Sequence, residues 1–146
     1  MDTTTASSWT SMGCKVAVAV RDDLAQWQRL NVKAFLVSGI GTARPDLIGR
    51  PYTDGDGRAY LPMLGLPVLV HAGPADALRR AFDRACERGL AVAVYTDELF
   101  STGNDVDNRA AVAAVPTAEL CLAGFAVAGD AKQVDKAFDK LRLHPA

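Results

Sequence analysis

The stretch Cys14-Lys-Val-Ala-Val-Ala-Val-Arg-Asp-Asp-Leu24 decides the fold class. Its first seven residues are rich in valine and mostly apolar at both alternating positions, which is typical of a strand covered on both faces. The acidic pair that follows favours a helix N-terminus, because carboxylates cap the first turn and match the helix dipole. Apolar residues then recur at helical spacing over 24–40. A buried strand that leads directly into a helix indicates an α/β domain.

Further strands and helices are expected downstream of this unit. Three short apolar runs predict core strands near 67–72, 90–95 and 120–128. Helical patterns follow them, over 74–88, 96–100, 105–115 and 131–143. The prolines and Asp-Gly steps of 44–66 exclude a long helix there and predict a hairpin over 52–60. Together these elements predict a three-layer α/β/α sandwich around a small sheet.

Length and composition fit one globular domain. Residues 1–12 are rich in threonine and serine and predict a flexible tail, and 13–146 predict a single α/β domain. Hydrophobic residues make up 49% of the chain and charged residues 23%, which is ordinary for a globular protein. The net charge of −1 disfavours a generic nucleic-acid or anionic-membrane binder.

The sequence also bears on the cellular compartment of the protein and on whether it holds a metal. No apolar run reaches the roughly 18 residues of a membrane span, and the N-terminus lacks the regions of a signal peptide. We therefore expect a cytoplasmic protein. The cysteines Cys14, Cys86 and Cys121 are far apart, and His71 and His144 are the only histidines. Neither a disulfide framework nor a metal site is indicated, and we expect no cofactor.

Common catalytic motifs are absent from the sequence. It contains no dinucleotide fingerprint between a strand and a helix, no P-loop and no G-x-S-x-G elbow. Polar residues near the carboxyl ends of strands remain, and ligands collect there in open α/β sheets. The candidate ligand-binding residues, expected to face one cleft, are Arg21, Asp23, Asn31, Tyr95, Thr96, Asn108 and Arg109. Two arginines among amide and hydroxyl groups suit a small carboxylate or phosphate. Asp23 would either orient an arginine or act as a base.

Several segments resemble known families. Residues 15–24 resemble the opening strand and turn of the second class of peptidyl-tRNA hydrolase, and the stretch from Gln133 is similar to its closing helix. Three segments look more like the bacterial domain-of-unknown-function family 2000, namely 30–36, 54–57 with Tyr60, and 104–110. This resemblance covers nearly the whole chain after residue 13. It implies a fold similar to that of the hydrolase, with a four-stranded mixed sheet and helices on both faces, and no established activity.

The sequence departs from the hydrolase at its catalytic motif. That family carries Gly-Lys-x-Ala-Ala-Gln in its first helix, and the lysine is needed for catalysis. An alignment without gaps from Arg21 places Arg29 and Leu30 at the Gly-Lys positions. Leucine can neither orient a water nor bind a phosphate, and Lys33 would point to another face. We therefore expect the fold without peptidyl-tRNA hydrolase activity, and no nucleic-acid partner.

Three functions stay open at this point. The first is binding of a small anionic ligand, which the missing catalytic motifs favour. The second is a hydrolase with a different constellation, drawn from Asp23, Asn31, Tyr95 and Arg109. The third is a homodimer formed through apolar helix faces such as 110–115. The sequence does not decide whether the protein is an enzyme.

Overall fold

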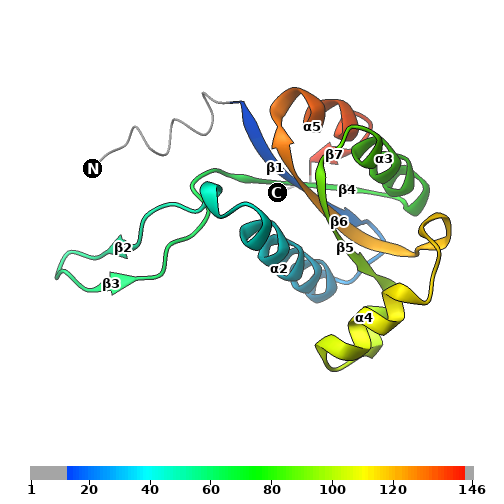
Figure 1. Ribbon diagram of the computed structural model, residues 1–146, viewed down its shortest axis with the longest axis horizontal. Helices are drawn as coiled ribbons and strands as arrows, with labels where there is room; N and C mark the ends of the chain where they lie inside the picture. The colour runs from blue at the N-terminus through cyan, green and yellow to red at the C-terminus, as the bar shows by residue number, and fades with distance from the viewer. Residues whose placement is uncertain (1–12, 144–146) are drawn as a thin grey trace.

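The computed structural model describes residues 13–143. The predicted tail over 1–12 and His144 lie outside the described residues. Five strands form one sheet in the order β5-β6-β1-β4-β7 (Figure 1). In chain order they are β1 (Cys14–Arg21), β4 (Val68–Gly73), β5 (Ala91–Thr96), β6 (Leu122–Asp130) and β7 (Arg142–Leu143).

The direction of the strands brings three carboxyl ends to one edge of the sheet. The central strand β1 is parallel to β4 and antiparallel to β6, so the sheet is mixed. Strand β5 is antiparallel to β6 and therefore runs in the direction of β1. Val20 and Tyr95 both pair with Gly124 of β6. The four strands predicted from the sequence are confirmed to within one or two residues at each end.

The expected count of four strands is wrong, because β7 adds a fifth at the edge. β7 pairs with His71 and Ala72 of β4. The sequence predicted a helix over 131–143, but helix α5 (Ala131–Phe138) ends earlier and the chain then joins the sheet. A strand of two residues carries no periodic pattern, so only its pairing with β4 defines it.

Helices cover both faces of this sheet (Figure 1). Val16, Val18 and Val20 pack in a core closed by α2 (Gln26–Ala43). Ala17 and Ala19 belong to a second core, on the side of α3 (Ala75–Glu87) and α5. Successive side chains of a strand point to opposite faces, so a strand buried on both faces is apolar at both alternating positions.

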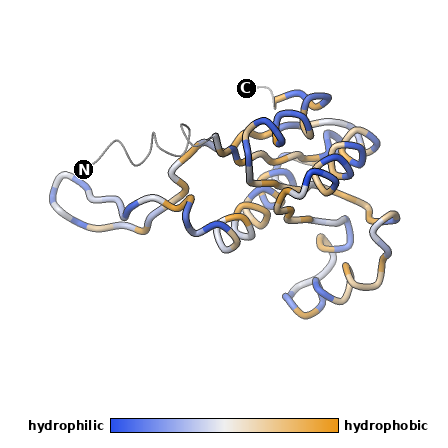
Figure 2. Tube along the Cα trace, turned by 45° about the horizontal axis from the view of Figure 1, so that its top comes forward, coloured by the Kyte–Doolittle hydropathy of each residue, from blue (hydrophilic) through white to orange (hydrophobic). Residues whose placement is uncertain are grey.

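Residues 49–63, which we call the arm, project away from the sheet and its helices (Figures 1 and 2). The arm contains β2 (Tyr52–Thr53) and β3 (Ala59–Tyr60), which pair as an antiparallel hairpin. The hairpin predicted over 52–60 is thereby confirmed. Its base stays attached to the body through the bridge between Ile48 and Leu64.

The remaining elements are short. The 3-10 helices are η1 (Pro45–Leu47), η2 (Asp97–Ser101) and η3 (Thr117–Glu119). Helix α4 (Asp105–Ala113) follows η2, and none of its residues is buried. Among the described residues, no helix is long and apolar enough to cross a membrane.

Candidate functional site

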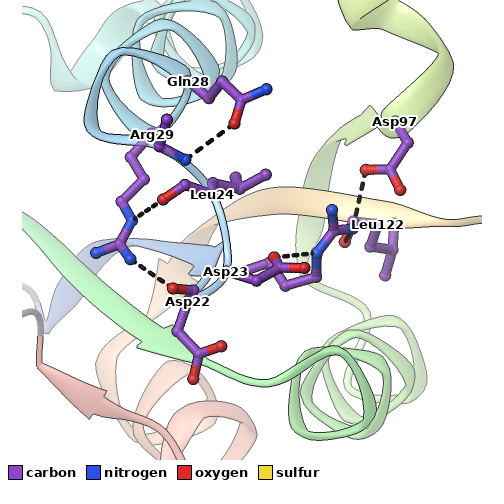
Figure 3. A network of polar contacts seen from close by, with 9 residues as sticks. Asp22, Asp23, Leu24, Gln28, Arg29, Asp97 and Leu122 are labelled. Carbon is purple, nitrogen blue, oxygen red and sulfur yellow. Dashed lines mark hydrogen bonds and ion pairs between the residues drawn. The ribbon is translucent and has the colours of Figure 1, made fainter.

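The turn between β1 and α2 is built differently from the acidic helix cap that the sequence predicted. Helix α2 begins after Ala25, and the side chain of Gln28 accepts a hydrogen bond from the Ala25 N–H at 2.9 Å. Arg29 donates to the backbone carbonyls of Leu24, at 3.1 Å, and Asp22, at 2.5 Å (Figure 3). The predicted acidic cap is therefore wrong, and the carboxylates of this turn are left for other partners.

Arg21 is the centre of a charged network at the carboxyl edge of the sheet, and its partners Asp23, Asp97 and Leu122 are labelled in Figure 3. Its Nε donates to Asp23 at 2.6 Å, and its Nη1 donates to Asp97 at 2.8 Å and to the carbonyl of Leu122 at 3.1 Å. Its side chain is only 15% exposed. Burial opposes the charge, but the hydrogen bonds with Asp23 and Asp97 outweigh it and raise the pKa of Arg21 above its ordinary value.

A cavity of about 750 Å³ adjoins this network, and we call it the Arg21 cavity. It lies between the ends of β1 and β6, the start of α3 and the segment around η3. Two arginines and five carboxylates line it: Arg21, Arg79, Asp22, Asp23, Asp76, Asp97 and Glu119. This balance of charge does not favour the small anion expected from the sequence.

A second cavity, of about 330 Å³, lies on the α2 side of the sheet. We call it the aromatic–amide cavity, because its lining includes four aromatic rings and three asparagines: Trp27, Phe35, Tyr95, Phe100, Asn31, Asn104 and Asn108. The rings contact one another, with centroid distances of 6.2 Å for Trp27 and Phe100 and 5.0 Å for Tyr95 and Phe100. Such rings offer faces for stacking or for a cation.

The polar groups of this cavity come from three elements. Asn31 of α2 donates to the hydroxyl of Tyr95, at the end of β5, at 3.4 Å. The side chain of Asn108 accepts a hydrogen bond from the hydroxyl of Thr102, and Asn104 caps α4 by accepting from the Asp107 N–H at 2.9 Å. Burial raises the pKa of the Tyr95 hydroxyl, although the Asn31 contact opposes the shift. Tyr95 is therefore a neutral hydrogen-bonding group at physiological pH.

A third cavity, of about 650 Å³, adjoins the second and shares Phe35, Tyr95 and Asn108 with it. Arg109 of α4 lines this third cavity. Its Nε forms an ion pair with Asp105 at 2.8 Å on an exposed surface.

Six of the seven candidate residues are thus divided among three cavities, of which only the second and third adjoin. Arg21 and Asp23 line the first, and Asn31, Tyr95 and Asn108 line the second. Arg109 lines the third. Thr96 is buried, and its hydroxyl has no hydrogen-bond partner in the part of the chain that the structure describes.

Strand alternation explains why one common cleft does not form. Arg21 has the parity of Ala17 and Ala19, which point toward α3 and α5. Tyr95 packs instead in the core closed by α2. Since the two side chains lie on opposite faces of the sheet, the expectation of one cleft containing all seven residues is wrong.

Sequence reasoning missed three aromatic residues of the second cavity, Trp27, Phe35 and Phe100. Trp27, Asn31 and Phe35 follow one another at intervals of four residues on α2. Residues at this spacing share one helix face, so the spacing could have revealed them. In the described range 13–143, no group of three or more His, Cys, Asp or Glu side chains could hold a metal ion.

Comparison with known families gives one match. Residues 14–145 match the family model described as protein of unknown function, DUF2000. A solved structure of a protein of unknown function from Agrobacterium tumefaciens is 41% identical and superposes with a TM-score of 0.88. The match covers 91% of this chain and 98% of that one. Among curated proteins no match was found. The chain therefore belongs to the DUF2000 family.

Proposed function

We propose that this protein binds a small molecule in the aromatic–amide cavity. The observation that carries the proposal is the meeting of four aromatic rings with three asparagine side chains in one cavity of about 330 Å³. Ligand sites commonly combine apolar and aromatic walls with a few placed polar groups, and this volume is at the small end of their range.

The electrostatics of the cavities favour an uncharged or cationic ligand. The anion expected from the sequence rested on Arg21 and Arg109. Arg21 is held by Asp23 and Asp97, and Arg109 is paired with Asp105. An anion would have to displace a carboxylate from either guanidinium. A flat, amide-bearing or heteroaromatic molecule instead meets ring faces and amide groups without that cost.

Binding fits this lining better than catalysis does. No histidine, cysteine or lysine is among the described residues that line the cavity. Tyr95 has a raised pKa and stays protonated, and the carboxylate of Asp105 is engaged by Arg109. A hydrolase needs an activated nucleophile or a free general base, and these groups supply neither.

A fold similar to the second class of peptidyl-tRNA hydrolase, without its activity, is part of the proposal. Its support is the resemblance of residues 15–24 together with a mixed sheet that carries helices on both faces. Leu30, which stands at the position of the catalytic lysine, is 61% exposed on α2. A surface that carries leucine in place of this lysine, on a chain with a net charge of −1, offers little electrostatic attraction to tRNA.

The test is a ligand panel read by thermal unfolding and by tryptophan fluorescence. Nucleobases, nucleosides, aromatic amides and methylated ammonium compounds are compared with inorganic phosphate and small carboxylates. A ligand of the first group should raise the unfolding temperature by mass action. Asn108→Ala should weaken that ligand about three- to tenfold, the scale of one hydrogen bond.

Gln133→Ala is the matched control, since it removes an amide that bonds Arg88 elsewhere on the surface. It should leave the affinity unchanged. A panel in which nothing from the first group stabilises the protein would contradict the proposal, as would equal effects of the Asn108 and Gln133 variants.

An anion in the Arg21 cavity is the second candidate. Five carboxylates in the lining oppose it, and its support is the presence of two guanidinium groups, Arg21 and Arg79, in the same cavity. Stabilisation by phosphate or a carboxylate that is lost in Arg79→Ala and kept in Asn108→Ala would select this site instead.

A further inference from the structure

The arm is ordered by its own hydrogen bonds. The carboxylate of Asp54 accepts hydrogen bonds from the N–H groups of Asp56 and Arg58, both at 3.0 Å, and from the hydroxyl of Tyr60 at 2.8 Å. Residues 50–63 are all exposed, so nothing in the described chain packs over them. An isolated two-stranded hairpin is only marginally stable in water, so these bonds preorganise a segment that lacks a core.

This preorganised arm carries a concentration of apolar surface. Leu61 is 84% exposed and Met63 58% exposed, and the exposed rings of Tyr52 and Tyr60 lie opposite each other in the hairpin. Single exposed apolar side chains are ordinary, but four of them on a projecting hairpin mark an interaction surface.

The outer face of α2 is a second surface with exposed apolar side chains. Trp27, Leu30 and Phe35 are more than half exposed, although Trp27 also contacts Phe100 and Phe35 contacts Tyr95. The exposed residues Ala34 and Ser38 are small. Surface helices normally turn a polar stripe to solvent, which this helix lacks over most of its length. The small residues leave room for the side chains of an approaching segment.

We propose that the arm of one copy lies along the outer face of α2 in a second copy, and reciprocally, in a two-fold symmetric dimer. The arm spans about 23 Å from Gly49 to its tip at ~3.3 Å per residue, and the 18 residues of α2 span ~27 Å. The arm continues from the end of α2 (Figure 1). A two-fold pair therefore brings the base of each arm to the end of the partner helix and the tip to its start.

Charges match at the place where the tip would lie. Val20, Leu30 and Val70 line an apolar hollow of about 180 Å³ beside the first half of α2, with Arg29 and Lys33 around it. The tip carries Asp56. Within residues 13–143, neither the ammonium of Lys33 nor the carboxylate of Asp56 has an ion-pair partner.

The exposed surfaces are large enough for a dimer. The half-exposed rings of Trp27, Phe35, Tyr52 and Tyr60 amount to on the order of 400 Å² per copy. Leu30, Leu61 and Met63 add to this area, and the total approaches the roughly 800 Å² that each partner buries in a standard interface. A second copy supplies both surfaces at once, because each copy carries an arm and an α2 face.

Sedimentation velocity over a wide concentration range tests the dimer. The wild-type protein should sediment as a dimer, and Leu61→Asp should raise the dimer Kd more than tenfold. Val106→Asp is the matched control, because Val106 is a highly exposed apolar residue on α4, at 74% against 84% for Leu61. It should leave the Kd unchanged, and circular dichroism checks that both variants are folded.

Charge reversal tests the direction of the arm. Lys33→Glu and Asp56→Lys should each weaken the dimer about two- to fivefold, and the double variant should restore it. A monomeric wild-type protein would overturn the proposal, and the partner of the arm would then be a different protein. A dimer that survives Leu61→Asp but dissociates in Val106→Asp would overturn it too, placing the interface on α4. Absence of restoration in the double variant would refute the arrangement of tip on helix. Trp27 and Phe35 also line the aromatic–amide cavity, so these experiments use protein without added ligand. The substituted residues lie outside that lining, and the outcomes therefore do not depend on the small-molecule proposal.

Discussion

Arg21 and Arg109 show how the partners of a side chain decide its chemistry. Both were expected to attract an anion, and both are neutralised by carboxylates of the same chain. The pair at Arg109 is exposed and worth little to stability, whereas Arg21 is mostly buried and also bonds a backbone carbonyl. The first arginine thus has a structural role at the sheet edge, and the second is a surface ion pair.

Gly124 is a residue that the packing of α2 on β6 requires. A Cβ there would come within 2.8 Å of the backbone oxygen of Ala19 and 2.7 Å of Val32 Cγ1. Gly124→Ala should therefore lower the free energy of unfolding by about 1–3 kcal/mol. Urea denaturation measures the change. Gly103→Ala is the control, because a Cβ at Gly103 meets nothing within 4 Å; equal stability of the two variants would contradict the packing argument.

Asp54 makes the order of the arm depend on pH. Its hydrogen bonds with Tyr60, Arg58 and Asp56 lower its pKa below the ordinary 3.8 and raise the pKa of Tyr60. Because the folded pKa is depressed, the contribution is complete above the ordinary value and is lost as pH falls through the lowered one. NMR titration should show the amides of Asp56 and Arg58 shifting together with the Asp54 carboxyl below pH 3.8. Titration at or above that value would contradict the network.

At the scale of elements, α4 has the fewest buried residues of the α-helices in the described chain. None of its residues is buried, whereas α3 buries five: Ala77, Leu78, Ala81, Phe82 and Ala85. Its N-terminus nevertheless contributes Asn104, Asp105 and Asn108 to the aromatic–amide cavity. An element held by few apolar contacts can open locally without global unfolding.

Amide hydrogen exchange measures this difference. The amides of α4 should exchange at least tenfold faster than those of α3, because α4 lacks buried contacts. A ligand in the aromatic–amide cavity should slow exchange in α4 and leave α3 unchanged. Equal protection of the two helices in the free protein would show that α4 is secured by contacts other than those described.

At the scale of the whole molecule, our proposal is a fold similar to that of the hydrolase without its reaction. We expect the purified protein to release no tRNA from peptidyl-tRNA above the background without protein. The reason is the exposed Leu30 at the position of the essential lysine. Release that increases with protein concentration, in a preparation free of host hydrolase, would contradict this prediction. The variant Leu30→Lys should also release no tRNA, because one lysine does not restore a complete catalytic site.

Local pattern was sufficient for most of the architecture. Residues close in sequence specify most elements. These are the strands β1, β4, β5 and β6, the helix α2 and the hairpin of the arm. Apolar periodicity and Asp-Gly turns act over a few residues, so they can be interpreted without the rest of the chain. The search for polar residues near strand ends and within the first helix indicated Asn31, Tyr95 and Asn108, which do share one cavity.

Only the tertiary structure decided which polar residues meet. The sequence placed Arg21 and Tyr95 at the ends of parallel strands, but it could not supply the parity that turns them to opposite faces of the sheet. It also could not supply β7, which is a strand only through its pairing with β4. Strand ends and helix positions follow from local pattern. The side of the sheet to which a side chain points depends on the register between strands distant in sequence, and that register is fixed only when the whole core packs.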